Sequence, residues 1–385
     1  MEFWDGADEA SWDEAQRRLF DLGVTDGLPV VPPTRRRVEA MLERCGLDAA
    51  GVVTLLPPVM VEATWGDIAV NAVMAGCLPE HLPVVGAAIE AIADPAFNFI
   101  GIASTTGSAT PALIVDGPIV DALGLNADCN LLGIQTTTGT PTGAAIVHGP
   151  AAARLGINAG ANLLGPGNRA NACIGRAVNL VLRNVGECRP GEFDMSTLGQ
   201  PAKYTCCIAE NVAASPWPAL HVERGFAADE SVVTVAGIAG SVEVVDSASS
   251  APEDLAQTFA QSMLIAGSLG GGAGALLGGG EPLLIMPPEI AAAFDRGGWS
   301  KSDVKSAIFE RAVMPADRLA GAVRDHLVGL RRAEGAADPL APIRVAARAD
   351  DLMIVVAGGV GIKSAYLPTW GGTTRAASRA IRSGR

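Results

Sequence analysis

The sequence predicts an α/β protein whose mixed or parallel sheet layers are built from internal repeats. Short apolar runs alternate with helical segments along most of the chain, which is typical of a sheet covered on both faces. A 32-residue unit also occurs twice without a gap, and residues 101–132 and 133–164 are identical at 18 of 32 positions. We expect these copies to be superposable units. A weaker echo indicates a diverged third copy near 281–312.

Composition limits the class of protein. The 385 residues suffice for two ordinary domains, and a Pro-, Gly- and Ser-rich crossing near Leu198 predicts α/β lobes over 1–198 and 199–385. A net charge of −13 argues against nucleic-acid binding. No apolar run reaches the length of a membrane span, and the acidic start lacks the features of a signal peptide. Seven scattered cysteines fit reduced thiols, so we expect a cytoplasmic protein.

In the first half, local signals define helices and one strand. Thr34 is a helix cap, and Thr64 with Asp67 forms the capping box of a later helix. The apolar run Val52 to Leu56 predicts a short buried strand. Helices are expected over 11–23, 34–45, from 64, 80–93 and 172–184.

The second half continues the alternation. Ser300 and Asp303 predict another capping box. Strands are expected over 231–236, 281–286, 343–347 and 351–357, and helices over 252–266, 288–296, 300–312 and 315–332.

The segment from Lys203 to Phe226 is the first candidate for a site. It packs cysteines, acids, amides, Trp, His and Arg between prolines, and loops dense in such side chains often carry function. The other interpretation is a structural crossing held by its own polar contacts. We assign Cys207 as the candidate nucleophile and Glu210 or His221 as the group that moves protons.

The adjacent Cys206 and Cys207 must face opposite ways if this segment is extended. A nearby Lys203 or His221 would lower a thiol pKa, whereas a buried cysteine is usually inert. No CxxC spacing occurs, and the four histidines lie far apart in sequence. We therefore expect no metal site and assign no cofactor.

A Gly-Pro-Gly loop before the helix at 172–184 is the second candidate. Its backbone N–H groups and Arg169 are suited to a carboxylate or phosphate. We expect it to meet the Cys206 to Arg224 segment in one pocket, with Glu210 and Glu223 as the acids nearest to the arginines. The predicted substrate-binding residues are Arg169, Asn171, Arg176, Asn211, Trp217 and Arg224.

Several longer motifs carry a resemblance to a known family. TDGLPVVPPT, RANACIGRA, PAKYTCCIAEN and SPWPALHVERGF together resemble a widespread bacterial family whose members are often encoded beside proteins with a Cys- or selenocysteine-containing UGSC motif. The resemblance implies thiol or redox chemistry and a two-component enzyme. It also implies that Cys207 is the more family-like thiol.

These observations predict an enzyme that acts on a small anionic organic molecule. Thiol-assisted redox or lyase-type chemistry is favoured over hydrolysis. The apolar excess, 49% of residues, predicts a homo-oligomer or a heteromer with a UGSC-motif-type protein. One alternative is a non-catalytic subunit or scaffold for a partner enzyme. Another is a repeat-built amidohydrolase of the cyanuric-acid-hydrolase sort, against which the shortage of lysines in the repeats counts.

Overall fold

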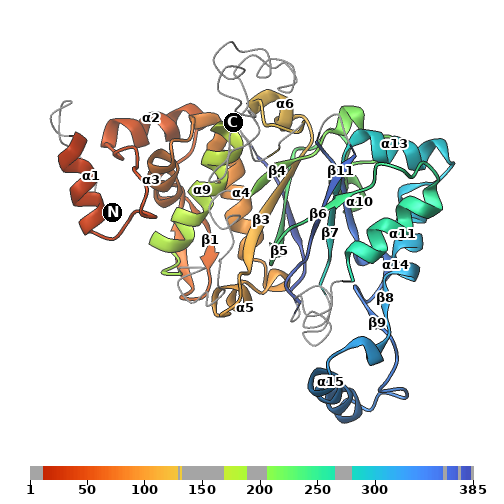
Figure 1. Cartoon of the computed structure of the whole chain (residues 1–385). Coiled ribbons are helices and arrows are strands. Elements are labelled where there is room, and N and C mark those ends of the chain that lie inside the picture. Colours follow the sequence, from red (N-terminus) through yellow and green to blue (C-terminus); the bar gives the residue numbers. More distant parts are fainter. Residues whose placement is uncertain are drawn as a thin grey trace, which may run out of the picture.

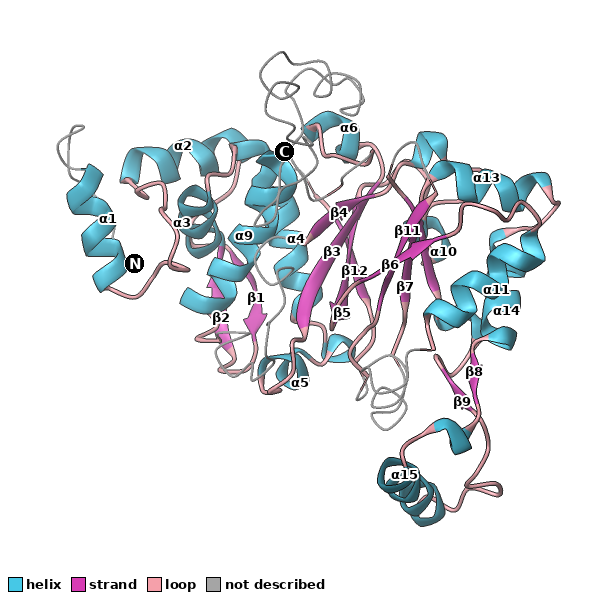
Figure 2. Cartoon of the chain, in the orientation of Figure 1, coloured by secondary structure: helices cyan, strands magenta, loops and turns pink. Residues whose placement is uncertain are grey.

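The computed structural model describes residues 12–128, 131, 169–188, 206–264, 280–358, 362–371 and 374–382. The second repeat copy and the boundary near Leu198 lie outside the described residues, so the internal repeats stay a prediction. Helices alternate with strands around two open, mixed sheets of four strands each, which confirms the α/β class (Figures 1 and 2).

The first sheet has the strand order β12-β5-β3-β4. β3 (Thr110–Asp116) is parallel to β4 (Cys207–Ala209) and antiparallel to β5 (Val232–Ile238), which in turn pairs with β12 (Ala377–Ala380). Every residue of β3 and β5 is buried, as expected for strands covered on both faces. Three of the four strands come from beyond residue 198, so this sheet joins the two halves of the chain.

The second sheet has the order β10-β7-β11-β6. β10 (Met353–Val356) is parallel to β7 (Leu283–Met286). β11 (Lys363–Leu367) is antiparallel to β7 and to β6 (Val242–Val245). β6, β11 and β12 are not among the strands expected from the sequence, and neither is β4 of the first sheet.

Helices cover the outer faces of both sheets (Figure 1). Beside the first sheet lie α1 (Trp12–Asp21), α2 (Arg35–Cys45), α3 (Trp65–Ala75), α4 (Leu82–Ile92) and α9 (Arg169–Asn184). Beside the second sheet lie α11 (Pro252–Ser262), α13 (Pro288–Arg296) and α14 (Lys301–Arg311). The remaining elements are α5 (Phe99–Ala103), α6 (Ile119–Leu123), α10 (Leu220–Glu223), α15 (Gly321–Ala333) and the hairpin of β8 (Val313–Met314) and β9 (Ile343–Arg344).

Side-chain alternation along the strands fixes the order of the layers. In β3, Leu113 and Val115 pack into the core with the first helices, whereas Ala112 and Ile114 pack against the second sheet. In β7 and β10 the same alternation divides the side chains between the inter-sheet core and the core under α11, α13 and α14. The result is a four-layer helix–sheet–sheet–helix sandwich.

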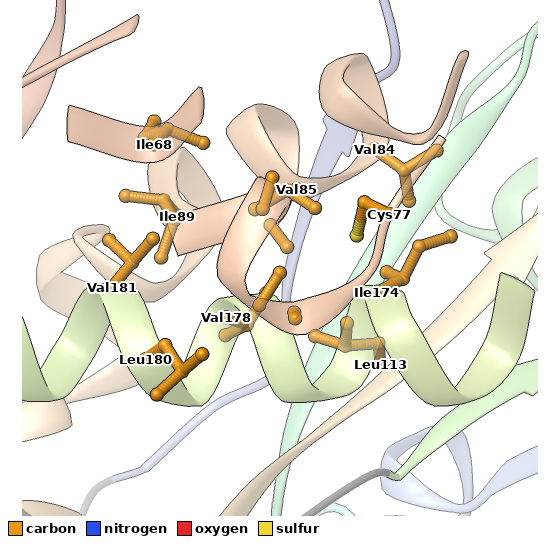
Figure 3. Packing of buried hydrophobic residues seen from close by; sticks show 14 of the residues in the cluster. Ile68, Cys77, Val84, Val85, Ile89, Leu113, Ile174, Val178, Leu180 and Val181 are labelled. Atoms are coloured by element: carbon orange, nitrogen blue, oxygen red, sulfur yellow. The ribbon is translucent and has the colours of Figure 1, made fainter. Parts of the chain in front are cut away.

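The first helical layer is packed around α4, of which ten of eleven residues are buried. Figure 3 shows Val85 and Ile89 of this helix facing Val178 and Val181 of α9. Gly86 is required here, because a Cβ atom at this position would lie 2.2 Å from the Trp65 ring. α3 therefore packs closely on α4 through Trp65.

Short-range signals in the sequence were reliable. Thr34 accepts the Arg37 N–H at the start of α2, and the capping boxes of Thr64 with Asp67 and of Ser300 with Asp303 both form. α13 spans the predicted residues 288–296. These contacts are set by neighbours within four residues, so the sequence suffices to predict them.

The prediction of a buried strand over Val52 to Leu56 was wrong in one respect. The strand, β1, exists, but it forms a separate antiparallel hairpin with β2 (Val61–Thr64). Only Leu56 is buried in it, because the hairpin packs one side against the helices and joins neither large sheet. Val52 and Leu55 are exposed, as are Val59 and Met60 at its turn.

No single helix among the described residues is long and apolar enough to cross a membrane. Residues 79–92 and 95–103 are long and apolar enough only when the two helical parts are taken together. The chain bends by 69° at the break between them.

Candidate active site

Two carboxylates lie side by side at one edge of the first sheet. β3 and β4 are parallel and in register from Leu113 with Cys207 to Val115 with Ala209, so the next residues, Asp116 and Glu210, are neighbours. The Glu210 N–H donates to the Val115 carbonyl at 3.1 Å and continues the ladder. Each acid follows by two residues a side chain of the inter-sheet core, Ile114 or Ile208, so both carboxylates point between the two sheets.

Glu210 is held by backbone donors from two other elements. Its Oε2 accepts the N–H of Leu220 at 2.8 Å, and its Oε1 accepts the N–H of Val356 at 3.3 Å. Leu220 begins α10 and Val356 ends β10, so Glu210 ties a short helix and the second sheet to the end of β4.

Asp116 lies in the same layer but has no such support. Burial, and next the charge of Glu210, raise the pKa of this carboxyl group well above its usual range. Lys301 acts in the opposite direction but does not reverse the shift. A hydrogen-bonding contact with the Glu210 side chain also raises the pKa of Asp116, and one with the His221 backbone lowers it. Neither contact has good hydrogen-bond geometry, and no other described residue is a partner of either Asp116 oxygen.

His221, in α10, is the side chain opposite Asp116. Its Nδ1 lies 4.0 Å from Asp116 Oδ2, and both side chains are essentially inaccessible to solvent. Neither ring nitrogen of His221 has a hydrogen-bond partner within the described part of the chain. The structure thus places an acid and an imidazole face to face, separated by slightly more than hydrogen-bond length.

A second charged cluster connects Glu223 of α10 with two lysines of α14. Glu223 accepts from Lys301 Nζ at 2.9 Å and from Lys305 Nζ at 3.0 Å. Lys301 also donates to the Pro218 carbonyl at 3.0 Å. These two lysines are buried, and each has an acidic partner.

Amide side chains form the border of the carboxyl edge. Asn171 Oδ1 accepts the Asn126 N–H at 2.8 Å, and Asn171 Nδ2 donates to the Cys207 carbonyl at 2.9 Å. Asn211 Nδ2 donates to Asp128 Oδ1 at 3.0 Å. The segment that follows α6 is therefore fixed beside the ends of β4 and β10.

The two predicted catalytic residues Glu210 and His221 come together, but Cys207 does not join them. Cys207 is fully buried on the helix side of β4, while Cys206 faces the inter-sheet core, which confirms that the two thiols point opposite ways. Burial raises the pKa of the Cys207 thiol far above its usual range. A thiol held in its protonated form is a poor nucleophile, so the geometry gives the proposed role of Cys207 no support.

The predicted anion-binding arginines are used elsewhere. Arg169 donates to the Gly76 carbonyl at 3.1 Å, and Arg176 forms a 2.7 Å ion pair with Asp26 and donates to the Pro29 carbonyl. Glu210 accepts from backbone N–H groups and Glu223 accepts from lysines, so these two acids do not pair with Arg169 and Arg176.

Two further predicted binding residues serve packing. Trp217 lies in the core of the second helical layer, and its Nε1 donates to the Trp299 carbonyl at 3.3 Å. Arg224 donates to Ser378 Oγ at 2.6 Å and lies 3.8 Å from Glu281. Both residues connect the 210–226 segment to its surroundings rather than lining a binding surface.

Sequence reasoning missed Asp116. The signal was present, because an acid directly ends the apolar run Ala112 to Val115, just as Glu210 ends the run through Ile208 and Ala209. An ionisable residue at the carboxyl end of a buried strand is a common position for function.

Within the described ranges, no group of three or more His, Cys, Asp or Glu side chains is arranged to hold a metal ion. Comparison of the chain with family models, with curated proteins and with solved structures gives no match.

Proposed function

We propose that this protein is an enzyme that transfers protons at the carboxyl edge of β3 and β4. The observation that carries the proposal is the buried pair of Asp116 and His221. Among the carboxylates, lysines and histidines that the structure describes as buried, these two alone have side chains without a hydrogen bond of good geometry.

The energetics favour function over structure for this pair. A buried polar group without a partner destabilises a fold by about 1–3 kcal/mol. Two such groups face to face are a poor way to stabilise an inter-sheet core that apolar side chains would fill. Unsatisfied buried groups in native proteins often mark a site that is completed by a substrate or a water.

The chemistry follows from the different surroundings of the two groups. Asp116, whose pKa is raised by burial and by Glu210, keeps its proton at higher pH than an ordinary carboxyl group and can donate it. His221 offers a ring nitrogen that can accept a proton. One proton leaves the substrate for His221 while Asp116 supplies one to a second atom, so no net charge is gained. Such a paired transfer suits a lyase- or isomerase-type reaction.

The substrate that fits these surroundings is a small neutral polar molecule rather than the anion expected from the sequence. Asp116, Glu210 and Asp128 give this edge an acidic character, and Arg169 and Arg176 are bound to protein oxygens.

Substrate profiling tests this proposal. The wild type, Asp116→Asn and His221→Gln are each incubated with a pool of small metabolites, and depletion is followed by mass spectrometry. We expect depletion by the wild type and a loss of at least about 100-fold in both variants, the usual scale for general acid–base groups. Thr110→Val is the matched control, because Thr110 is also buried and unpartnered on β3 but lies at its other end. Equal turnover by the wild type and both variants would rule the proposal out.

A second candidate function has its own observation. The turn and strands of the β1–β2 hairpin expose Val52, Leu55, Val59 and Met60. Several exposed apolar side chains on one hairpin are typical of a subunit interface. We propose it as the contact of a homo-oligomer or heteromer. Sedimentation of the wild type against a Leu55→Ser, Met60→Ser double variant tests this, and an unchanged monomer in both excludes it.

A further inference from the structure

The first helical layer contains a cavity remote from the candidate active site. It has a volume of about 360 Å³ and lies between the end of α1, α3 and the end of α9. Asn184 in its wall stands thirteen residues along α9 from Asn171, a rise of roughly 20 Å. The volume falls within the usual range for small-molecule sites, about 300–1,000 Å³.

Most of the wall is apolar. Leu19 of α1 and Val70 and Met74 of α3 form much of it. These side chains match a hydrocarbon or aromatic body, and burial of such a body supplies most of the binding free energy in sites of this kind.

The polar part of the wall consists of Asp67 and two amides, Asn71 and Asn184. Asn184 Nδ2 already donates to the Val24 carbonyl at 2.9 Å and to Asn71 Oδ1 at 2.7 Å. Asn71 Nδ2 donates to the Asp67 carbonyl at 2.9 Å. Because both N–H groups of the Asn184 amide are engaged inside the protein, this side chain has only its carbonyl oxygen to offer a ligand.

Asp67 adds a negative charge beside that carbonyl. It lies one helical turn before Asn71 on the same face of α3. Its Oδ2 accepts from the Thr64 N–H at 3.0 Å and from Thr64 Oγ1 at 2.6 Å, which leaves Oδ1 available. Among the described residues Asp67 forms no ion pair.

We infer that this cavity binds a small organic ammonium ion. The ammonium group donates to Asp67 Oδ1 and to the Asn184 carbonyl, and the apolar body lies against Leu19, Val70 and Met74. A neutral ligand forms no ion pair with the carboxylate, and an anionic ligand is repelled by it.

Isothermal titration with 2-phenylethylammonium tests the inference, with 2-phenylethanol as the uncharged probe of similar shape. We expect saturable binding of the ammonium ion and at least tenfold weaker binding of the alcohol. This contrast is measured on the wild-type chain and does not depend on whether a variant folds.

Two variants test whether Asp67 binds the ammonium group. Asp67→Asn should weaken binding of the ammonium ion about tenfold or more. Asp303→Asn is the matched control, because Asp303 occupies the same capping-box position in α14, away from the cavity. It should keep wild-type affinity. Absence of saturable binding, equal affinity for the two probes, or an equal loss in both variants would overturn the inference.

Discussion

Two charged clusters lie two residues apart on α10, and they are built in opposite ways. Glu223 has two lysine partners at 2.9 and 3.0 Å, and a backbone carbonyl takes a further donor of Lys301. His221 faces Asp116 at 4.0 Å, and neither side chain has a hydrogen bond of good geometry within the described residues. The same short helix thus carries one satisfied cluster and one unsatisfied cluster.

The difference separates structural from functional charge. A buried ion pair with complete partners holds elements together, and removal of one member is costly because the others stay behind unpaired. A buried pair without partners adds little to stability, so its retention is better explained by chemistry. Substitutions at Glu223 and at Asp116 test this division, because their effects on the free energy of unfolding should differ in size and sign.

The largest effect is expected for Glu223→Gln. The substitution keeps the shape but leaves two buried lysines facing a neutral amide, so the free energy of unfolding should fall by about 3 kcal/mol or more. Urea denaturation measures it. Glu243→Gln is the control, because the pair of Glu243 and Lys363 is exposed and should contribute at most about 1 kcal/mol. Equal losses in the two variants would contradict the structural role of the Glu223 cluster.

A second, smaller effect is expected at His81, which is also buried in the described part of the chain. Burial, and next the charge of Arg169, lower the pKa of His81 to about 4, and its Nδ1 accepts the Leu78 N–H at 3.3 Å. Because the folded pKa lies below the unfolded value of 6.5, His81 stabilises the fold above pH 6.5. That contribution is lost as the pH falls toward 4 and amounts to roughly 3 kcal/mol.

The variant His81→Asn keeps an acceptor for Leu78 but cannot be protonated in this range. Its stability should therefore change less between pH 6.5 and 4 than that of the wild type, as followed by thermal melts. Parallel pH profiles of the two proteins would show that His81 does not titrate as its burial requires.

The smallest effect on stability is expected at Asp116. Its pKa is raised in the folded state, so its contribution is present below the ordinary value of 3.8 and is lost as the pH rises toward the folded pKa. Asp116→Asn removes this penalty. The variant should match the wild type near pH 4 and be more stable than the wild type at neutral pH.

Denaturation of Asp116→Asn at pH 4 and pH 7 checks this expectation. A large loss of stability at both values would place Asp116 with the Glu223 cluster, as a structural group, and would weaken the proposed function.

The sequence predicted local structure well because local contacts determine it. The caps at Thr34, Thr64 and Ser300 need only residues within one turn. β6, β11 and β12 were missed because each is short and partly exposed and carries polar side chains, so no apolar run marks it. Their strand character comes from partners far away in sequence.

The candidate site was predicted only in part for the same reason. Glu210 and His221 stand in one conspicuous segment, whereas Asp116 reaches them only through the parallel pairing of β3 with β4. The arginines were misjudged because Asp26, the partner of Arg176, lies 150 positions away and nothing near it in the sequence indicates the contact. Long-range pairing, not residue type, was the missing information.

The strands of the first sheet come from distant parts of the chain, so they are synthesised at different times. α4 is buried almost completely against a sheet whose strands extend from Thr110 to Ala380, and Arg379 bonds Asp94 across 285 positions. A ribosome releases residues in order, so the apolar helices of the first layer emerge long before β5 and β12 can cover them. Such late closure of distant contacts slows folding. Until the last of these strands has been added, α4 lacks part of the sheet that buries it in the folded chain.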